Sequence, residues 1–541
     1  MIPNKLHILD WNRPLLPAVT ERLLSFSEGS LIDLSHLIVI VPTRQSGRRL
    51  LEALAVKIRD TSQGLLPPAI LTPDTLLSRA LKDAPLANEP AVTAAWVNVL
   101  SAIDPKHFEA VFPIDPVQSA GWQLGMAQRI MQLRDELGEE GLGLHEAAQL
   151  ADESGYESER WRQLARLEAL YFDQLKLHQL TDPKQARRQA ADQFTVPPGI
   201  ERILLIATPD AQALPLKALA KAAEKVPVEV WTYGDSDYFD AWGRPLTEFW
   251  NNRPLDFEGW NCQLKASPEP KSAVAEVAQL TANAEPEAIL IGLADSDLAP
   301  LLADELTRRE IPYYDPEGTP VHLGGIGRLT ELLCQFSQQA DTTTARTLLQ
   351  HPDLFQYIQA SDSQKHLLKK LDQCFETHLC ADLDALTKFT DDARLRGALK
   401  ALKGLQSQIK QAKTFSEGLS AALQTIYAEV EIETGEASKP WRERAEAVRK
   451  LIAEVADAEA TFPQLSSDLA RNLVLQGLRK TKVYPDRPRR AHDLLGWLEL
   501  LWNDAPQLAL VGINEGKVPE SVIGDAFLPE TLREVDRKSV V

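Results

Sequence analysis

Leu37-Ile-Val-Ile-Val41, followed at once by Pro42 and Thr43, is the stretch that decides the fold class. A continuous apolar run rich in β-branched residues is typical of a strand that is buried on both faces of a parallel sheet. The residues after it predict a helix that begins near Thr43, because Leu50 and Leu54 recur at helical spacing. A strand, a turn and a helix in this order indicate the start of an α/β unit.

The same alternation returns further along the chain. Arg202-Ile-Leu-Leu-Ile-Ala-Thr208 and Val228-Glu-Val-Trp-Thr232 predict two strands around a helix, and Ala288-Ile-Leu-Ile-Gly-Leu293 begins a second unit. Between these strands the apolar pattern is almost wholly helical. We therefore predict an α/β fold of two parallel-sheet domains, each interrupted by a helical insertion. The predicted segments are 1–88 and 196–265 for the first domain, 89–195 for its insertion, 266–325 and 491–535 for the second domain, 326–490 for its insertion, and 536–541 as an artefactual tail.

Composition places the chain among soluble globular proteins. Of its 541 residues 44% are apolar and 25% are charged, which is enough to form several cores. No apolar run approaches the roughly 20 residues of a membrane helix, and the N-terminus has no secretory pattern, so we expect a cytoplasmic protein without membrane contact. Cysteines are few, and Cys374, His378 and Cys380 lie too close together, without a second ligand pair, to predict a metal site.

Charge limits the partners of the chain. The net charge of −19 excludes a small, uniformly basic nucleic-acid binder but allows a local basic channel in a large protein. The stretch from Arg471 to Arg490 departs most from the acidic average, with seven cations against Asp486 alone. It is a candidate for contacts with a phosphate backbone, and a solvated linker is the alternative.

Two α/β units with helical insertions resemble superfamily 1 helicases of the UvrD type. Val39-Ile-Val-Pro-Thr-Arg-Gln-Ser-Gly-Arg-Arg-Leu-Leu51 resembles the strand and turn after which those proteins contact single-stranded DNA. Leu495-Gly-Trp-Leu-Glu499, followed by Leu508-Ala-Leu-Val-Gly-Ile-Asn-Glu-Gly-Lys-Val-Pro519, is similar to their late motor motif. With Leu9-Asp-Trp-Asn-Arg-Pro-Leu-Leu16 and Asp525-Ala-Phe-Leu-Pro-Glu-Thr-Leu532, the chain resembles AddB-like proteins over about residues 6 to 534.

AddB-like proteins are helicase-nuclease subunits of bacterial double-strand-break repair, and the resemblance implies DNA, an AddA-like partner subunit and a PD-(D/E)XK nuclease that uses magnesium. That nuclease would follow the segments present here, so we interpret the chain as truncated and assign it no catalytic residue. The resemblance and the basic stretch together give the candidate DNA-binding residues Thr43, Arg44, Arg48, Arg49, Arg487, Arg489 and Arg490. The residues similar to the late helicase motif are Gly496, Glu499, Asn514, Glu515 and Gly516, of which we interpret Gly496 and Glu499 as structural turn residues.

The departures from the family concern ATP. An active motor wraps phosphates in a glycine-rich loop that ends in Lys and Ser or Thr, whereas this chain has Asp10-Trp-Asn-Arg-Pro-Leu-Leu16 in that place. Where a motor presents an Asp-Glu pair, Asp210 stands alone after a proline. We therefore expect no ATP hydrolysis and no bound cofactor in this chain.

The leading hypothesis is thus an ATPase-inactive, helicase-like DNA-binding scaffold of a double-strand-break repair helicase-nuclease. One alternative is an active ATP-dependent DNA helicase with a divergent nucleotide site. Another is a non-catalytic protein-interaction scaffold. Trp11 and Trp497 are candidates for stacking on single-stranded bases, although core packing is the commoner role of a tryptophan.

Overall fold

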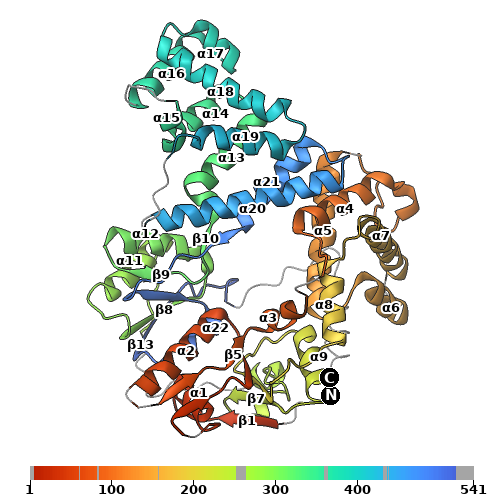
Figure 1. Ribbon diagram of the computed structural model, residues 1–541, viewed down its shortest axis with the longest axis vertical. Coiled ribbons are helices and arrows are strands. Elements are labelled where there is room, and N and C mark those ends of the chain that lie inside the picture. The colour runs from red at the N-terminus through yellow and green to blue at the C-terminus, as the bar shows by residue number, and fades with distance from the viewer. Residues whose placement is uncertain are drawn as a thin grey trace.

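The computed structural model describes residues 5–518 except 28, 60, 62, 82–83, 118, 156, 252–262, 359–363, 431–434 and 436–437. Within these residues the protein is a mixed α/β molecule with two parallel sheets and two large helical blocks (Figure 1). The segment 536–541 and the motif at 525–532 lie outside the described residues.

The first sheet has five parallel strands, in the order β1-β7-β6-β3-β5. Its core forms on both faces, because alternate residues of one strand enter different clusters: Val39 packs with the helices α1 and α2, and Ile38 with α3 and α9. The strand predicted at 37–41 and its following helix are confirmed. The elements are β1 (Lys5–Leu9), α1 (Leu15–Leu24), β3 (Leu37–Ile40), α2 (Arg44–Arg59), β5 (Ala69–Leu71), α3 (Pro73–Ser78), β6 (Arg202–Ile206), α9 (Ala213–Ala222), β7 (Val228–Tyr233) and α10 (Thr247–Asn251), with a small parallel pair β2 (Leu31–Asp33) and β4 (Gly64–Leu66) beside them.

The first helical block lies between β5 and β6 in the sequence and is held together by a buried ionic network. Arg134 donates two hydrogen bonds to Asp182, at 3.0 and 3.1 Å, and one to Glu168 at 2.7 Å. Tyr171 donates to the same aspartate at 2.6 Å and stacks on Trp96. Every charge in this network therefore has partners, as a buried charge requires. The helices are α4 (Glu89–Ala102), α5 (Ala120–Glu139), α6 (Leu144–Ser154), α7 (Ser158–Leu177) and α8 (Pro183–Asp192).

The second sheet has four parallel strands in the order β13-β8-β12-β9, covered by α11 and α12. The strand β13 is at an edge and pairs only with β8 among the described residues. The strand β12 had no counterpart among the sequence predictions. The elements are α11 (Pro270–Thr281), β8 (Ile289–Leu293), α12 (Ala299–Arg308), β9 (Tyr313–Tyr314), β12 (His492–Leu495), α22 (Trp497–Leu500) and β13 (Gln507–Val511), and an antiparallel pair β10 (Thr319–Pro320) and β11 (Lys482–Val483) joins this sheet to its helical insertion.

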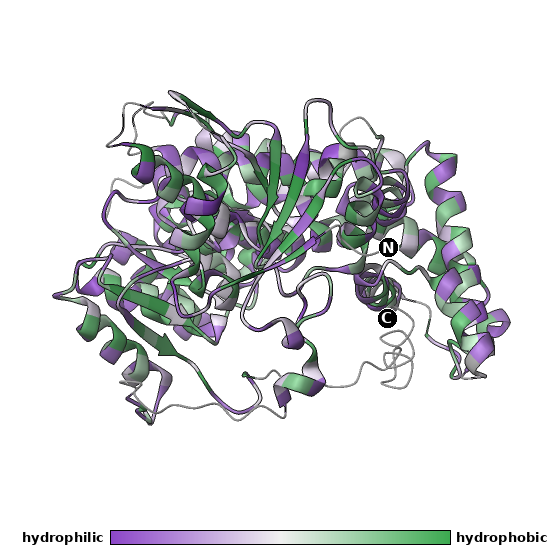
Figure 2. Ribbon diagram, turned by 90° about the horizontal axis from the view of Figure 1, so that it is seen from below, coloured by the Kyte–Doolittle hydropathy of each residue, from purple (hydrophilic) through white to green (hydrophobic). Residues whose placement is uncertain are grey.

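The second helical block shares one hydrophobic core with the first. Apolar residues from both blocks belong to a single cluster, and α4 packs on α20, where Asn88 Nδ2 donates to the carbonyl oxygen of Glu454 at 3.3 Å. In Figure 2 hydrophobic residues dominate several strands, whereas most helices alternate hydrophobic and hydrophilic residues. The helices are α13 (Gly325–Gln338), α14 (Thr342–Gln350), α15 (Pro352–Tyr357), α16 (Gln364–His378), α17 (Leu383–Phe389), α18 (Ala393–Gln411), α19 (Phe415–Tyr427), α20 (Lys439–Thr461) and α21 (Ser467–Lys480).

Short 3₁₀ turns complete the described secondary structure. They are η1 (Arg79–Leu81), η2 (Pro105–Phe108), η3 (Ser236–Tyr238), η4 (Ser296–Leu298) and η5 (Val321–Leu323).

Candidate nucleic-acid interface

A groove of 520 Å³ opens at the carboxyl ends of β3 and β5, and we call it the arginine groove. Two threonines stabilise the starts of the helices that line it. Thr43 Oγ1 accepts the backbone N–H of Ser46 at 3.1 Å at the start of α2, and Thr72 forms a reciprocal capping box with Thr75 at the start of α3. The lining residues are Val41, Thr43, Arg44, Gly47, Arg48, Leu51, Ile70, Leu71, Thr72, Thr75, Ser78 and Arg79.

Arg44 and Arg79 are the two exposed arginines of this groove. Neither forms an ion pair with any other described residue. The groove lining also includes the apolar residues Ile70 and Leu71. Two exposed guanidinium groups without an ion-pair partner among the described residues can attract an anionic ligand, and the apolar lining can accept its uncharged part. Arg44 was predicted from the sequence but Arg79 was not, because no sequence pattern indicates that the start of η1 lies next to α2.

Arg48 also lines the groove, but its guanidinium is already bound. Its Nε donates to Gln45 Oε1 at 2.9 Å, its Nη1 to Glu52, and its Nη2 to Asp493 Oδ2 at 2.8 Å. The partner Asp493 lies on β12 of the second sheet. The structure therefore places this predicted DNA-binding residue at the contact between the two sheets.

Asp493 is the centre of that contact. It is buried, and besides Arg48 it accepts hydrogen bonds from Gln45 Nε2 at 3.0 Å and from Arg487 Nε at 2.7 Å. Arg487 also donates to the carbonyl oxygen of Ala491 at 3.0 Å. Arg487 is thus held inside the contact by an aspartate that no sequence motif indicated.

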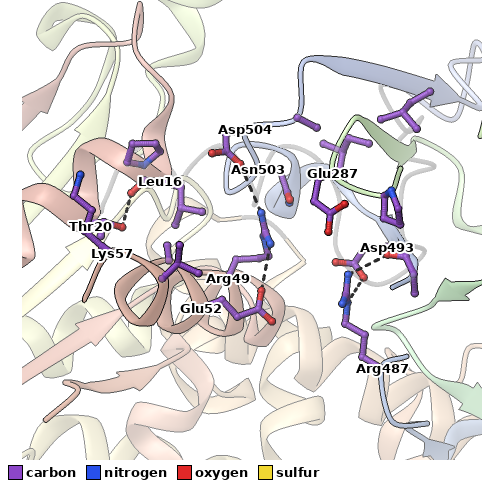
Figure 3. A pocket seen from close by; sticks show the side chains of 18 of the residues that line it. Leu16, Thr20, Arg49, Glu52, Lys57, Glu287, Arg487, Asp493, Asn503 and Asp504 are labelled. Atoms are coloured by element: carbon purple, nitrogen blue, oxygen red, sulfur yellow. Dashed lines mark hydrogen bonds and ion pairs between the residues drawn. The ribbon is translucent and has the colours of Figure 1, made fainter. Parts of the chain in front are cut away.

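A second cavity, of 630 Å³, lies between the sheets, and we call it the inter-sheet cleft (Figure 3). Helices α1 and α2 form one side, and residues around β8, β12 and the start of β13 form the other. Figure 3 shows Arg49 between Glu52, at 3.2 Å, and Asp504, at 3.7 Å. The consecutive arginines of α2 therefore face different surroundings: Arg48 borders the groove, and Arg49 borders the cleft.

The turn after β12 also reaches the first sheet. Gly496 is the N-cap of α22, and Glu499 in that helix is buried. Burial raises the pKa of Glu499, and a hydrogen bond with Thr43 offsets part of this rise. Glu499 and Thr43, named from two separate motifs, are thus brought together by the fold.

The remaining candidate residues lie on the surface. Arg489 lines the inter-sheet cleft, and Arg490 is exposed, 3.9 Å from Glu285. The exposed residues Asn514, Glu515 and Gly516 follow β13. Arg471, the first cation of the predicted basic stretch, is instead buried in α21 and paired with Asp468 at 2.8 Å. Arg471 lies on the inward face of its helix and does not present its charge at the surface, whereas Arg489 and Arg490 are exposed.

The turn after β1 is closed by its own hydrogen bonds. The backbone N–H of Asn12 donates to Asp10 Oδ1 at 2.9 Å, and that of Arg13 donates to the Asp10 carbonyl oxygen at 3.3 Å. The single hydroxyl proton of Tyr233 is shared between the carbonyl oxygens of Trp11 and Arg13, which lie 3.0 and 2.7 Å from its oxygen. Two of the amides at this turn thus already have an acceptor, and a carboxylate lies beside them.

Aromatic side chains gather at the carboxyl ends of β1 and β7. A Cβ on Gly234, whose φ is +143°, would lie 3.0 Å from the ring of Phe239 and 3.6 Å from that of Trp11, so these rings close around the glycine. Tyr238 contacts Phe249 with ring centroids 6.4 Å apart, and Trp11 and Phe249 are 41% and 46% exposed. Because all five strands are parallel, these rings lie on the same edge of the sheet as the arginine groove.

Asp210 lies on this edge too, in the loop after β6, and is exposed. Partial burial raises the pKa of the Asp210 carboxyl group, and the negative charge of Asp74 raises it further. Asp210 is the single carboxylate of the segment 206–210, whereas an active motor has a pair of acids in the corresponding motif.

No protein-family model matches the chain, and no curated protein is detectably similar to it. Among the described residues no helix is long and apolar enough to cross a membrane, and no group of three or more His, Cys, Asp or Glu side chains could hold a metal ion. Cys374 and Cys380 are buried next to one another, and His378 stacks on Phe389 instead.

Proposed function

We propose that this chain is a helicase-like, DNA-binding subunit of a double-strand-break repair helicase-nuclease, and that it serves as an ATPase-inactive scaffold. The observation that carries this proposal is the arginine groove, in which Arg44 and Arg79 form no ion pair with any residue that the structure describes. Single-stranded DNA is the proposed ligand because the strand offers phosphates to these cations, and because its bases can stack on exposed rings elsewhere on the same edge of the sheet.

The carboxyl edge of the first sheet gives the strand a path. The exposed rings of Trp11 and Phe249 stand at one end of the edge and the arginine groove at the other. Four inter-strand spacings separate β1 from β5, or roughly 19 Å at about 4.8 Å each. This length accommodates several nucleotides, with backbone contacts at the groove and base stacking at the rings. Contacts of these kinds position a strand without reading its sequence.

The proposed fold is a pair of P-loop-helicase-like domains, each carrying a helical insertion. The support is the order of elements: a parallel sheet interrupted by α4–α8, then a second parallel sheet interrupted by α13–α21. The resemblance to AddB-like proteins further suggests an AddA-like partner subunit and a magnesium-dependent nuclease domain in the complete helicase-nuclease.

The proposed lack of ATPase activity rests on the turn after β1. A phosphate cradle needs unpaired backbone amides, whereas the amides of Asn12 and Arg13 donate to Asp10. The Asp10 carboxylate would also repel a phosphate. The alternative, an active helicase with a divergent site, predicts that millimolar ATP with magnesium raises the melting temperature. We expect no shift, and a reproducible stabilisation by ATP would favour the alternative.

The test of DNA binding is fluorescence anisotropy with a labelled 12-nucleotide oligo-dT over a range of salt concentrations. Each phosphate contact contributes about 0.7 to the slope of log affinity against log salt for single strands, so Arg44→Gln/Arg79→Gln should flatten the slope by about 1.4. The matched control is Lys400→Gln/Lys410→Gln, which removes two exposed charges from α18, a helix that lies far from α2 and α3 in Figure 1.

Two outcomes would refute the proposal. One is the absence of oligonucleotide binding by the wild-type chain even at low salt, which would favour the protein-interaction scaffold. The other is equal flattening of the salt slope in the groove variant and the control variant.

A further inference from the structure

Arg48 borders the arginine groove on one side and the inter-sheet contact on the other. It belongs to the groove lining, while its partner Asp493 belongs to the lining of the inter-sheet cleft. A ligand in the groove and the second sheet can therefore both approach the same guanidinium group.

In the structure the second sheet, through Asp493, binds the guanidinium group of Arg48. Asp493 and Glu52 each accept a hydrogen bond from a terminal nitrogen of Arg48, and Gln45 accepts the third bond, from Nε. A guanidinium has five N–H donors in a fixed fork, and all three nitrogens of this one are in use. The side chain of Asp493 is only 7% exposed, so it offers Arg48 a pre-positioned anion away from solvent.

We propose that Asp493 restrains Arg48, and that single-stranded DNA entering the groove competes with Asp493 for this guanidinium. Binding of the strand is thereby coupled to the contact between the two sheets. The inference rests on the proposed function and adds the regulation of the same site.

The exchange leaves no buried charge without a partner. When Arg48 turns toward a phosphate, Asp493 keeps its hydrogen bonds from Gln45 and Arg487. The two sheets also keep other contacts, including the ion pair of Arg49 with Asp504. Release of Arg48 therefore weakens the inter-sheet contact without separating the sheets. By linkage, a contact that the strand weakens must in turn weaken binding of the strand.

The experiment is the same anisotropy titration with Asp493→Asn, a variant of nearly equal size that lacks the charge. We expect the oligonucleotide to bind about two- to fivefold more tightly at low salt, the range of a partly exposed ion pair. We also expect a salt slope steeper by about 0.7, one phosphate contact. Arg48→Met/Asp493→Asn should cancel both gains.

Asp504→Asn is the matched control, because this acid lines the same cleft but pairs with Arg49, which does not line the groove. Its affinity and slope should equal those of the wild type. Should Asp493→Asn fail to fold, Glu52→Gln provides the second test: it frees Arg48 from its other carboxylate within α2, and a smaller gain of the same sign is expected.

The outcomes separate the inference from the proposed function. Wild-type binding that depends on Arg44 and Arg79, with no gain in Asp493→Asn or Glu52→Gln, would overturn the coupling and leave the DNA-binding proposal standing. A gain that persists in the double variant with Arg48→Met would also overturn the coupling. No binding by any variant at low salt would overturn both.

Discussion

Trp502 offers the sharpest test of how the two sheets are joined. It lies between α22 and β13 of the second unit, yet it is fully buried and belongs to the hydrophobic cluster of Leu9, Leu15 and Leu16 in the first. We predict that Trp502→Ala loosens the contact between the sheets. Trp497→Ala, five residues earlier and 47% exposed, is the matched control.

The expected magnitude follows from this burial. Truncating a fully buried tryptophan to alanine costs about 3–5 kcal/mol, through lost transfer energy and the cavity left behind. The indole nitrogen of Trp502 has no hydrogen-bond partner among the described residues. A buried unsatisfied donor costs about 1–3 kcal/mol, so the wild type already bears this cost. Trp502→Phe, which removes the donor and keeps a ring, should therefore cost much less than Trp502→Ala.

The assay is native-state hydrogen exchange by mass spectrometry, with urea denaturation for the global free energy of unfolding. In Trp502→Ala, exchange should accelerate in α1 and α2, because both helices contribute to the hydrophobic cluster that contains Trp502. The first helical block should keep wild-type protection. Unchanged exchange in α1 and α2, or an equal effect of Trp497→Ala, would refute the assignment of Trp502 as a residue that joins the sheets.

Two further predictions concern the buried network of the first helical block. Arg134→Met leaves Asp182 and Glu168 buried without a cation and should destabilise the protein by about 3–5 kcal/mol in urea denaturation at pH 7; a loss below about 1 kcal/mol would contradict this role. Burial alone would raise the pKa of Asp182, but Arg134 and hydrogen bonds lower it below its ordinary value. The stabilisation from this depressed pKa is therefore fully present above the unfolded value of about 3.9 and is lost as the pH falls through the folded value. In Arg134→Met the lowering effect of Arg134 is gone while the hydrogen bonds from Tyr171 and Gln185 remain. The variant should therefore lose less stability than the wild type as the pH falls, and urea titrations of both proteins across pH 3–7 would detect the shallower slope.

The sequence predicted much of the fold because its signals are local. A run such as 37–41 is apolar and β-branched throughout, so it can be buried on both faces of a sheet wherever its neighbours come from. The long helical insertions were recognised from spacing in the same way. Strand β12 was missed because His492 and Asp493 interrupt its apolar pattern. Both side chains are buried, and Asp493 is matched by polar partners far away in the sequence.

The candidate site was predictable only in part, for a related reason. Arg44, Arg48 and Arg487 could be named because arginines are visible in a sequence, but their partners could not. Arg48 and Asp493 are 445 positions apart, and nothing in either segment indicates that they meet. A cation read as available for phosphate can already be neutralised by the fold, which is the case for Arg48 and Arg487 and is not the case for Arg44.

The nature of the inter-sheet contact bears on the choice between a motor and a scaffold. A nucleotide-driven motor opens and closes the contact between its two sheet domains in each cycle, so that contact must be cheap to break. Here opening would expose Trp502 and leave Asp493 with fewer of its donors, at a cost of several kcal/mol by the magnitudes above. The backbone amides of Asn12 and Arg13 already donate to Asp10. A nucleotide therefore finds no unpaired amide at these two residues, and its binding there would not offset the free energy needed to open the contact. Both features favour the proposed DNA-binding scaffold over a motor, and we expect a side-chain exchange at Arg48, not a movement of whole domains, to accompany binding.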